Sequence, residues 1–536
     1  MSESRLDPVY VVAGAVRIQQ WIARTPELAL SRGASRALAK RTGGEQITRH
    51  LDASVLSGAV EVARDAPDVD GVVALKVASA SDRDVNAAVG WLRRHLGEHL
   101  PGVEWKLWAH QASNYVSAFE AASGSGALSH GRWHQVPASI EVVMAAACGG
   151  CRQESALLAH PELRNSWIPS RCAGCGEESE SLARRLPGDD PLTALGLDCL
   201  VRRGHTAGET ESRAWTFDKL ARSGGVDPSA KKLPQTLGRR AANNHLATIA
   251  ADGNRVGALF KSLAKIPAEE YKTAEGRTST IHQEISAQLH DAAKAAVDTA
   301  SAVGDPNAPY LCSIDHVVGG DDVLVSVSAR FAWRYVRVLL GTFDRSCRDG
   351  MHDVIVEATG AGKLSAAAAA ELAALVDKVS LSVGVAFANR KHPFAHCTEM
   401  AQQALSEAKR RGEGEPAVCW LDLTVESSVP RGRWLAASAL SVEPIVAALP
   451  PSARATLAAL IRDGWLSPPV PEEPEDFEKR AAAIWGEVQV WSGRTGHDDV
   501  LRQFEAFGAD SLELLRRLEC DLDLARWWHI EEQPEA

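Results

Sequence analysis

The sequence predicts a multidomain α+β protein, and three observations support that fold class. The element order β-α-β-β-α-β, typical of a ferredoxin-like unit, occurs twice, at residues 8–148 and 246–423. Two close pairs of cysteines separate the units, and from about residue 431 the patterns are helical. We therefore expect an α+β domain, a cysteine-containing helical insert, a second α+β domain and a C-terminal helical domain. Their expected boundaries are 1–147, 148–243, 244–427 and 428–536.

Short apolar runs alternate with amphipathic stretches through both α+β units. In the first unit, strands are expected at Val9–Val16, Ala59–Val62, Val72–Val77 and Val103–Ala109, and helices at Pro26–Lys40 and Asp82–Leu100. In the second, strands are expected at Leu246–Ala250, Tyr310–Val318, Val323–Val327, Val379–Ala388 and Ala417–Leu423. Its helices are expected at Arg255–Leu263, Thr278–Val303, Phe331–Cys347 and His396–Arg411. Helices are also expected at Arg433–Leu449, Ser452–Trp465, Phe477–Ser492 and Asp498–Trp528.

Composition limits the classes of function. The chain has 536 residues, 45% hydrophobic and 24% charged, which leaves room for several packed domains of about 100–200 residues each. No apolar run approaches the roughly 20 residues of a membrane span, and Met1–Asp7 lacks a signal core. We expect a cytoplasmic protein without membrane contact. The net charge of −11 disfavours a protein that grips nucleic acid with its whole surface, so RNA contacts would be local or shared with partners.

The segment Val317–Val327, VVGGDDVLVSV, predicts a hairpin that carries two carboxylates. Gly319 and Gly320 allow the positive φ angles of a tight turn, and Asp321 and Asp322 follow at the start of the outgoing strand. Because neighbouring strand residues face opposite ways, the two carboxylates should be inequivalent. One would face a cleft, and the other would reach it from the turn.

A third carboxylate follows the strand expected at 246–250. Asp252 is expected at the strand tip, where Gly253 lets the chain turn sharply into a helix whose first N–H groups can receive phosphate oxygens. First and third strands are neighbours in such a sheet, so Asp252 should meet the hairpin. Three carboxylates suit two Mg²⁺ or Mn²⁺ ions, which prefer oxygen ligands and assist phosphate chemistry in pairs. The expected catalytic and metal-binding residues are Asp252, Asp321 and Asp322.

Other residues are expected around a nucleoside triphosphate. Lys409, at the end of a helix, can neutralise phosphate charge, although basic residues there also complement the helix macrodipole. The Gly-Gly-Asp-Asp segment could equally be an ordinary polar surface turn. The expected nucleotide-binding residues are Gly253, Asn254, Gly257, Gly319, Gly320, Ser382 and Lys409.

The insert opens with Cys148-Gly-Gly-Cys151 and continues with Cys172-Ala-Gly-Cys175. Two C-x₂-C pairs at this separation supply four thiolates for a tetrahedral Zn²⁺. The alternative is a set of buried or redox cysteines. Because four protein ligands leave zinc no open position, we expect a structural ion. The other six cysteines, including Cys199, are expected to be reduced and buried small side chains.

Four short sequence motifs together resemble a known palm domain. They are the Asp252-Gly253 loop, the Gly319–Asp322 hairpin, the Ser382-x-Gly384 strand and the helix end Ala408-Lys409. This set is similar to the palm shared by GGDEF diguanylate cyclases and the large subunit of type III CRISPR effector complexes (Csm/Cmr-type). The second aspartate, in place of glutamate, favours the CRISPR subunit. So do Val12–Ile22 and Arg32–Ser35, which resemble its first palm, and the cysteine pairs, which lie where that family carries a zinc module.

The resemblance implies a nucleotidyltransferase that makes cyclic oligoadenylate second messengers from ATP when guide RNA pairs with target RNA. The implied partners are crRNA, target RNA, a small helical subunit and backbone subunits. The first palm has Arg64–Gly71 at its hairpin instead of Gly-Gly-Asp-Asp, so we expect it to be catalytically degenerate. Many members begin with an HD nuclease domain. Here the first strand starts within ten residues, and no HD nuclease activity is expected.

Two other functions stay open from the sequence alone. One is a stand-alone cyclic dinucleotide synthetase, which would be active as an isolated homodimer. The other is a non-enzymatic scaffold subunit of a ribonucleoprotein. A scaffold has no evident use for Asp252, Asp321 and Asp322, because clustered carboxylates repel one another. The tryptophans of the C-terminal helices are expected to pack in a core rather than to stack on bases.

Overall fold

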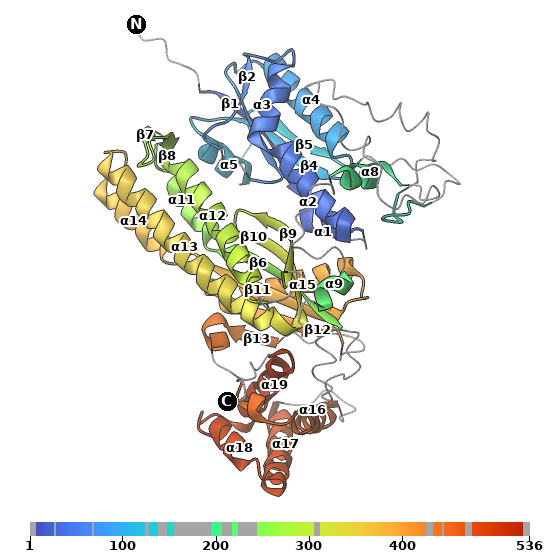
Figure 1. Ribbon diagram of the computed structural model, residues 1–536. Coiled ribbons are helices and arrows are strands. Elements are labelled where there is room, and N and C mark those ends of the chain that lie inside the picture. The colour runs from blue at the N-terminus through green and yellow to red at the C-terminus, as the bar shows by residue number, and fades with distance from the viewer. Residues whose placement is uncertain are drawn as a thin grey trace.

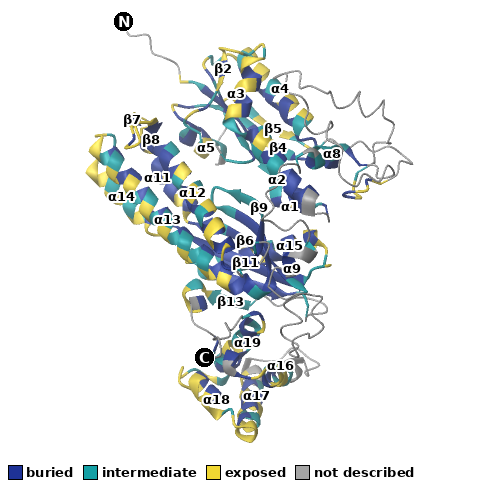
Figure 2. Ribbon diagram, viewed as in Figure 1, coloured by how far each residue is buried: buried dark blue, intermediate teal, exposed yellow. Residues whose placement is uncertain are grey.

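The computed structural model presents two α+β domains and a C-terminal group of helices in succession along the molecule (Figure 1). It describes residues 7–25, 28–66, 69–123, 128–137, 147–154, 195–205, 217–222, 244–267, 269–304, 311–424, 433–441, 444–466 and 474–528. The α+β fold class predicted from the sequence is confirmed for these ranges. Buried residues concentrate in the two sheets and on the helix faces turned toward them (Figure 2).

The first domain contains a five-stranded sheet in the order β2-β3-β1-β4-β5. Its strands are β1 (Val9–Val16), β2 (Val60–Val62), β3 (Val72–Val77), β4 (Glu104–Gln111) and β5 (Gly131–Gln135). The central strand β1 is antiparallel to both β3 and β4. The four predicted strands are therefore confirmed, in the strand order of a ferredoxin-like sheet, with β5 added at one edge.

Five helices accompany this sheet: α1 (Ile18–Ala23), α2 (Leu28–Thr42), α3 (Gly44–Asp52), α4 (Asp82–His99) and α5 (Tyr115–Ser123). The start of α4 is set by Ser81, whose side chain accepts a hydrogen bond from the Asp84 N–H at 3.2 Å. Val85, Val89 and Leu92 follow at helical spacing and pack into the core. The sequence did not predict α3.

The second domain contains a six-stranded sheet in the order β13-β12-β11-β6-β10-β9. Its strands are β6 (His245–Asn254), β9 (Ser313–Gly319), β10 (Asp322–Ser328), β11 (Ser380–Asn389), β12 (Ala417–Asp422) and β13 (Arg433–Ala436). The small strands β7 (Glu270–Lys272) and β8 (Thr278–Thr280) form a separate hairpin. The strands predicted for this unit are confirmed, but β6 runs on through Asp252, which was expected to follow the strand.

Helices cover both faces of the second sheet (Figure 1). They are α11 (Val256–Leu263), α12 (Ile281–Ser301), α13 (Ala332–Gly360), α14 (Ala366–Val376) and α15 (Phe394–Gly412). The long helices α12 and α13 pack together on one face, and α15 packs on the other beside the short helix α9 (Phe217–Arg222). The prediction that a helix ends at Cys347 is wrong, because α13 continues to Gly360 as one 29-residue helix.

The C-terminal helices are α16 (Pro451–Leu466), α17 (Pro474–Thr495), α18 (Asp498–Glu505) and α19 (Ser511–Trp527), and they share a hydrophobic cluster. Trp527 stacks on Phe387 of β11 with ring centroids 4.9 Å apart and donates a hydrogen bond to Asp422 at 3.0 Å. This packing attaches α19 to the second sheet. The helix predicted at Arg433–Leu449 is wrong, because β13 pairs with β12 at its start and the described residues that follow form only the short 3₁₀ helices Ala437–Ser441 and Ile445–Ala448.

The insert is described only in part, with α8 (Leu197–Gly204) and α9 (Phe217–Arg222). Cys172 and Cys175 lie outside the described residues. In the part of the chain that the structure describes, no single helix is long and apolar enough to cross a membrane, although one bent pair passes by length and composition.

Candidate active site and metal centre

The strands β6 and β10 are neighbours, and their register brings the predicted carboxylates together. Val323 pairs with Ala251 in an antiparallel ladder, so Asp322 lies opposite Asp252 at the next position. Asp321 lies in the preceding turn, where Gly320 has a φ of 60°. The chain folds in this way because Gly320 tolerates that conformation and apolar residues on both sides continue the strands.

Gly253 brings the two carboxylate-bearing segments close together. A Cβ atom added at Gly253 would lie 2.5 Å from Oδ2 of Asp321, so a larger residue would displace that side chain. The turn into α11 is made by Arg255, whose φ is 61°. The prediction that Gly253 makes the sharp turn is therefore wrong, because its backbone belongs to β6 and its small size serves close approach.

Lys409 contacts the carboxylate group directly. Its ammonium donates hydrogen bonds to the Asp252 carboxylate and, at 2.9 Å, to the carbonyl oxygen of Gly253. Both side chains stay about one-third exposed, at 32% for Lys409 and 35% for Asp252. The approach of α15 depends on Gly384, where an added Cβ would lie 2.1 Å from the carbonyl oxygen of Ala401. Lys409 thus does more than complement the macrodipole of its helix.

Burial and mutual repulsion make the ionised carboxylates unfavourable. Burial, followed by the charge of Asp252, raises the pKa of Asp321 to about 6. Burial and the charges of Asp252 and Asp321 raise the pKa of Asp322 to about 7. A divalent cation would relieve this repulsion, and carboxylate oxygens are the donors that Mg²⁺ and Mn²⁺ prefer. The three carboxylates therefore fit such ions. Without an ion, the Lys409 ammonium supplies the positive charge beside Asp252.

A residue of the first domain also reaches this site. Gln19 of α1 is buried, and its amide donates a 3.2 Å hydrogen bond to Oδ1 of Asp322. Gln402 of α15 in turn donates to the side-chain oxygen of Gln19. Gln19 lies in the segment Val12–Ile22, whose resemblance to a first palm indicated no role for this side chain. No local signal marks it, because its importance arises only when two distant segments pack together.

Asn254 and Ser382 lie beneath the carboxylates and bond to each other. The Ser382 hydroxyl donates to Oδ1 of Asn254 at 3.1 Å, and the Asn254 amide donates to the hydroxyl of Ser380 at 3.1 Å. Ser382 is fully buried and is paired in register with Asp252. These bonds hold the strand positions next to Asp252. Asn254 and Ser382 therefore support the site, whereas Gly319 and Gly320 are at its rim and partly exposed.

Comparison with known proteins places this site in a family. Residues 245–417 match the family model of Cas10/Cmr2, second palm domain. This part of the chain is similar to that second palm domain. The expected resemblance to the large subunit of type III CRISPR effector complexes is thereby confirmed for the domain that carries Asp252, Asp321 and Asp322. No curated protein matches the chain.

Three similar solved structures share 13% sequence identity with the chain. One is a Csm1-Csm4 cassette in complex with cA4, with a TM-score of 0.41 and coverage of 98% of this chain and 70% of that one. A second is the same cassette in complex with one ATP, with a TM-score of 0.45 and the same coverage. The third is Csm1 in T. onnurineus, with a TM-score of 0.44 and coverage of 97% and 69%.

A cavity of about 540 Å³ lies between the first domain and α12 of the second palm. Arg64 and Val69 line it from the first domain, and Gln283 and His290 line it from α12. The carboxylates do not line it, but the Gly320 N–H donates to Nδ1 of His290 at 3.4 Å. The cavity therefore adjoins the carboxylate hairpin through this histidine.

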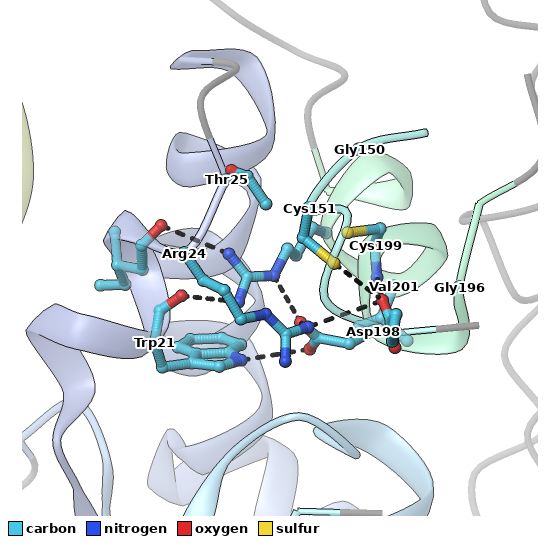
Figure 3. A network of polar contacts seen from close by, with 12 residues as sticks. Trp21, Arg24, Thr25, Gly150, Cys151, Gly196, Asp198, Cys199 and Val201 are labelled. Carbon is cyan, nitrogen blue, oxygen red and sulfur yellow. Dashed lines mark hydrogen bonds and ion pairs between the residues drawn. The ribbon is translucent and has the colours of Figure 1, made fainter. Parts of the chain in front are cut away.

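The first cysteine pair lies in a compact group of metal-ligand side chains, namely Cys148, Cys151, Glu154 and Cys199, whose donor atoms all lie within 4.8 Å of one another. Figure 3 shows Cys151 and Cys199 with their sulfur atoms turned toward each other. The expectation that Cys199 is reduced and buried is confirmed, but its position beside the cysteine pair was not predicted. It is buried, but the start of α8 carries it to the cysteine pair.

Hydrogen bonds around Cys148 favour its thiolate form, whereas burial raises the pKa of Cys151 and the hydrogen bond to Cys148 raises the pKa of Cys199. A bond from the Cys199 thiol is the main cause that lowers the pKa of Cys148 to about 4. The N–H groups of Gly196 and Gly150 also point at the Cys148 sulfur, at 3.1 and 3.4 Å. Such N–H···S contacts and low pKa values suit a metal-binding thiolate.

An ion-pair network fastens the thiol group to α1. Asp198 of α8 accepts hydrogen bonds from the Trp21 indole at 3.2 Å, from Arg202 at 2.7 Å and from Arg24 (Figure 3). Arg24 also lies 3.5 Å from Glu154. Because Asp198 is 2% exposed and has three donors, its charge is compensated within the protein. The insert is thus fixed to the same helix that carries Gln19 to Asp322.

Proposed function

We propose that the chain is a nucleotidyltransferase that makes cyclic oligoadenylates from ATP as the target-RNA-activated large subunit of a type III CRISPR effector complex. The convergence of Asp252, Asp321 and Asp322 in a Cas10/Cmr2 second palm carries this proposal. The choice of ATP and the partners rest on the family resemblance. Those partners are crRNA, target RNA, a small helical subunit and backbone subunits.

In the proposed site, three carboxylates hold two divalent cations next to the reacting phosphate. Asp252, Asp321 and Asp322 would bind two Mg²⁺ or Mn²⁺ ions. When bound, a pair of such ions activates an attacking hydroxyl and stabilises the oxygens of the leaving group. Asp321 would reach from the turn, and Asp322 would be oriented by Gln19.

The triphosphate would lie over the start of α11 and the hairpin glycines. Gly257, Gly319 and Gly320 carry no side chain that would keep phosphate oxygens from the backbone, and the Gly320 N–H would exchange its contact with His290 for phosphate. Gly253 lies in β6 and would leave room for the Asp321 carboxylate beside the phosphates. Lys409 would exchange its contact with Asp252 for the phosphates once ions occupy the carboxylates. This exchange leaves both Lys409 and Asp252 paired with an opposite charge in both states.

The first palm would act by framing this site rather than by catalysis. Gln19 contacts Asp322, and Asp70 approaches Gly319, where an added Cβ would lie 4.0 Å from that of Asp70. Separation of the two palms would therefore remove a support of the metal-binding carboxylate. A bound partner that moves the first palm would therefore change the hydrogen bond between Gln19 and Asp322.

We also propose a structural Zn²⁺ at Cys148 and Cys151. The second predicted pair, Cys172 and Cys175, supplies two further candidate ligands, and Cys199 supplies another from α8. Serine substitution at Cys199 and at Cys172, with zinc counted in each purified variant, tests the ligand set. Loss of zinc from only one variant would identify that cysteine as a ligand.

Product formation from radiolabelled ATP with Mg²⁺ or Mn²⁺ tests the proposed activity. The isolated chain and the assembled complex with matched target RNA are each compared with Asp321→Ala/Asp322→Ala. Cyclic adenylates that appear only with target RNA and vanish in the variant are the expected result. Equal activity of the isolated chain would favour the stand-alone synthetase. No turnover under any condition would leave the scaffold function.

A further inference from the structure

Three histidines come together in the first domain, on elements separate from the carboxylates and the thiols. His50 lies on α3, and His95 and His99 lie one turn apart on α4. One ring nitrogen of each histidine lies within 4.8 Å of one ring nitrogen of the other two. His50 and His95 are buried, and His99 is partly exposed. An ion could therefore enter from solvent at His99.

The rings are arranged about a common point. Their centroids are 4.8 Å apart for His50 and His95, 5.2 Å for His50 and His99, and 4.7 Å for His95 and His99. A tetrahedral ion with imidazole nitrogens about 2.0–2.1 Å away would hold the ring centres roughly 5 Å apart. The rings are tilted by 59° to 74°, unlike the parallel stack of Trp91 on His95. Tilted rings can direct three nitrogens to one position.

The surroundings orient His95 as a ligand, whereas Nε2 of His50 accepts a 3.1 Å hydrogen bond from the Gln46 amide, so His50 would bind an ion through Nδ1 or after that amide turns. Nε2 of His95 lies 3.3 Å from the carbonyl oxygen of Arg41, which can only accept a hydrogen bond. The proton therefore belongs on Nε2, and Nδ1 keeps its lone pair, as in metal-binding histidines oriented by a carbonyl group.

We infer that His50, His95 and His99 form a binding site for a divalent transition metal, with Zn²⁺ the preferred ion. Imidazole nitrogen is a common zinc ligand, and three such ligands leave one position for water or a fourth side chain. His205 at the end of α8 is close enough for its charge to act on His99. Its Nδ1 lies 2.9 Å from the Val201 carbonyl oxygen, which leaves Nε2 with the lone pair.

One neighbouring charge opposes the ion. The Arg41 guanidinium contributes to the lowered pKa of His95 and His99, so it also repels a bound cation. The site would join α3 to α4 and, through His205, to the helix that carries Cys199. Its role would be structural and independent of nucleotidyl transfer.

Zinc content and Co²⁺ absorption of the full chain test this site. The protein is loaded with Zn²⁺, dialysed and analysed for metal, beside His99→Ala and the matched variant His134→Ala from the same domain. We expect His99→Ala to lose one zinc equivalent and His134→Ala to keep the wild-type count. The cobalt–thiolate absorption of the cysteine centre should be the same in all three. Equal zinc counts in wild type and a folded His99→Ala would overturn the inference.

A measurement on the unaltered protein covers the case in which His99→Ala fails to fold. Crystals of the wild-type chain grown with zinc should show an anomalous difference peak between His50, His95 and His99 at the zinc absorption edge. A map with a peak at the thiols and none between these three rings would also overturn the inference, because packing of neutral histidines would then account for the cluster.

Discussion

The hairpins of the two palms occupy the same place in their sheets, but their carboxylates have opposite surroundings. In the first palm, Asp65 accepts hydrogen bonds from the Tyr10 hydroxyl at 2.6 Å and the Tyr115 N–H at 2.8 Å. In the second, burial and mutual repulsion raise the pKa values of Asp321 and Asp322. The first hairpin uses its carboxylate to hold the domain together. The second keeps carboxylates that gain from a bound cation.

The strand registers show where the palms diverge. In the second palm, Asp322 is the first residue of its strand and lies opposite Asp252. In the first, Val72 is the first residue of the equivalent strand and is paired with Gly14. Glycine and valine thus stand where the second palm has two metal-ligand candidates. This difference supports the proposal that the first palm is catalytically degenerate.

The largest expected effect comes from removing charge in the second hairpin. Asp322→Asn keeps the side chain's shape but lowers its value as a metal ligand. Removing a residue that hydrogen-bonds a metal ligand typically lowers metal affinity or activity by about 10–100-fold, so removing the ligand itself should lower activity more. We expect more than about 100-fold lower cyclic adenylate formation in the assembled complex, measured from radiolabelled ATP.

Asp65→Asn in the first hairpin is the matched control for Asp322→Asn. It should keep activity per folded molecule, while the free energy of unfolding falls by about 1–3 kcal/mol because the partly buried acceptor of the Tyr10 and Tyr115 hydrogen bonds is altered. Comparable losses of activity in both variants would contradict the division of roles between the hairpins.

Close approach at Gly253 gives the next effect. Gly253→Ala would place a Cβ 2.5 Å from Oδ2 of Asp321 and displace that carboxylate from its position beside Asp252. We expect Mn²⁺ affinity and activity to fall by about tenfold or more, since a loss of 1.4 kcal/mol is a factor of ten. Mn²⁺ titration of the isolated chain measures the affinity, and product formation from radiolabelled ATP in the assembled complex measures the activity. Gly341→Ala, where an added Cβ meets nothing within 4 Å, should leave both unchanged.

Gln19 tests whether the first palm supports the site. Its hydrogen bond lowers the pKa of Asp322, so Gln19→Ala should raise that pKa further and move Mn²⁺ binding to higher pH. A hydrogen bond to a charged group contributes about 1.5–3 kcal/mol, so affinity near pH 7 should fall by about tenfold. A titration at several pH values measures this. An unchanged pH profile in a folded variant would show that Gln19 only packs.

The smallest expected effect is on stability without Mg²⁺ or Mn²⁺. Both hairpin carboxyl groups have folded-state pKa values above 3.8, at about 6 and about 7. The folded chain therefore holds protons that the unfolded chain has released, and stability falls as pH rises from about 4 to about 7. Asp321→Asn/Asp322→Asn should unfold at higher temperature than wild type at pH 8 and at an equal temperature at pH 4.

The difference in Tm should be about ten degrees or more, because each unit of these pKa shifts is about 1.4 kcal/mol and about 1 kcal/mol moves Tm by about 2–4 °C in a domain of this size. Calorimetry in magnesium-free buffer measures it. A variant less stable than wild type at pH 8 would show that the carboxylates support the fold instead of straining it.

Much of this site could be predicted because short local sequence patterns mark its residues. Gly-Gly-Asp-Asp between apolar runs predicts a hairpin, and the repeated element order predicts which strand brings Asp252 beside it. Gln19 and Cys199 could not be assigned, because each gains its role from packing between distant segments. Gly253 was assigned to a turn because glycine size and glycine flexibility give the same sequence signal. Only the backbone angles separate the two.

Manganese binding to the carboxylates tests the central claim most directly. Wild-type chain and Asp321→Ala/Asp322→Ala are titrated with Mn²⁺ in the presence of a non-hydrolysable ATP analogue, and bound ions are counted by electron paramagnetic resonance. The proposed site predicts two closely spaced Mn²⁺ ions in wild type and neither in the variant. Equal Mn²⁺ binding by both proteins would contradict it, because the ions would then lie elsewhere and the three aspartates would have lost their proposed role.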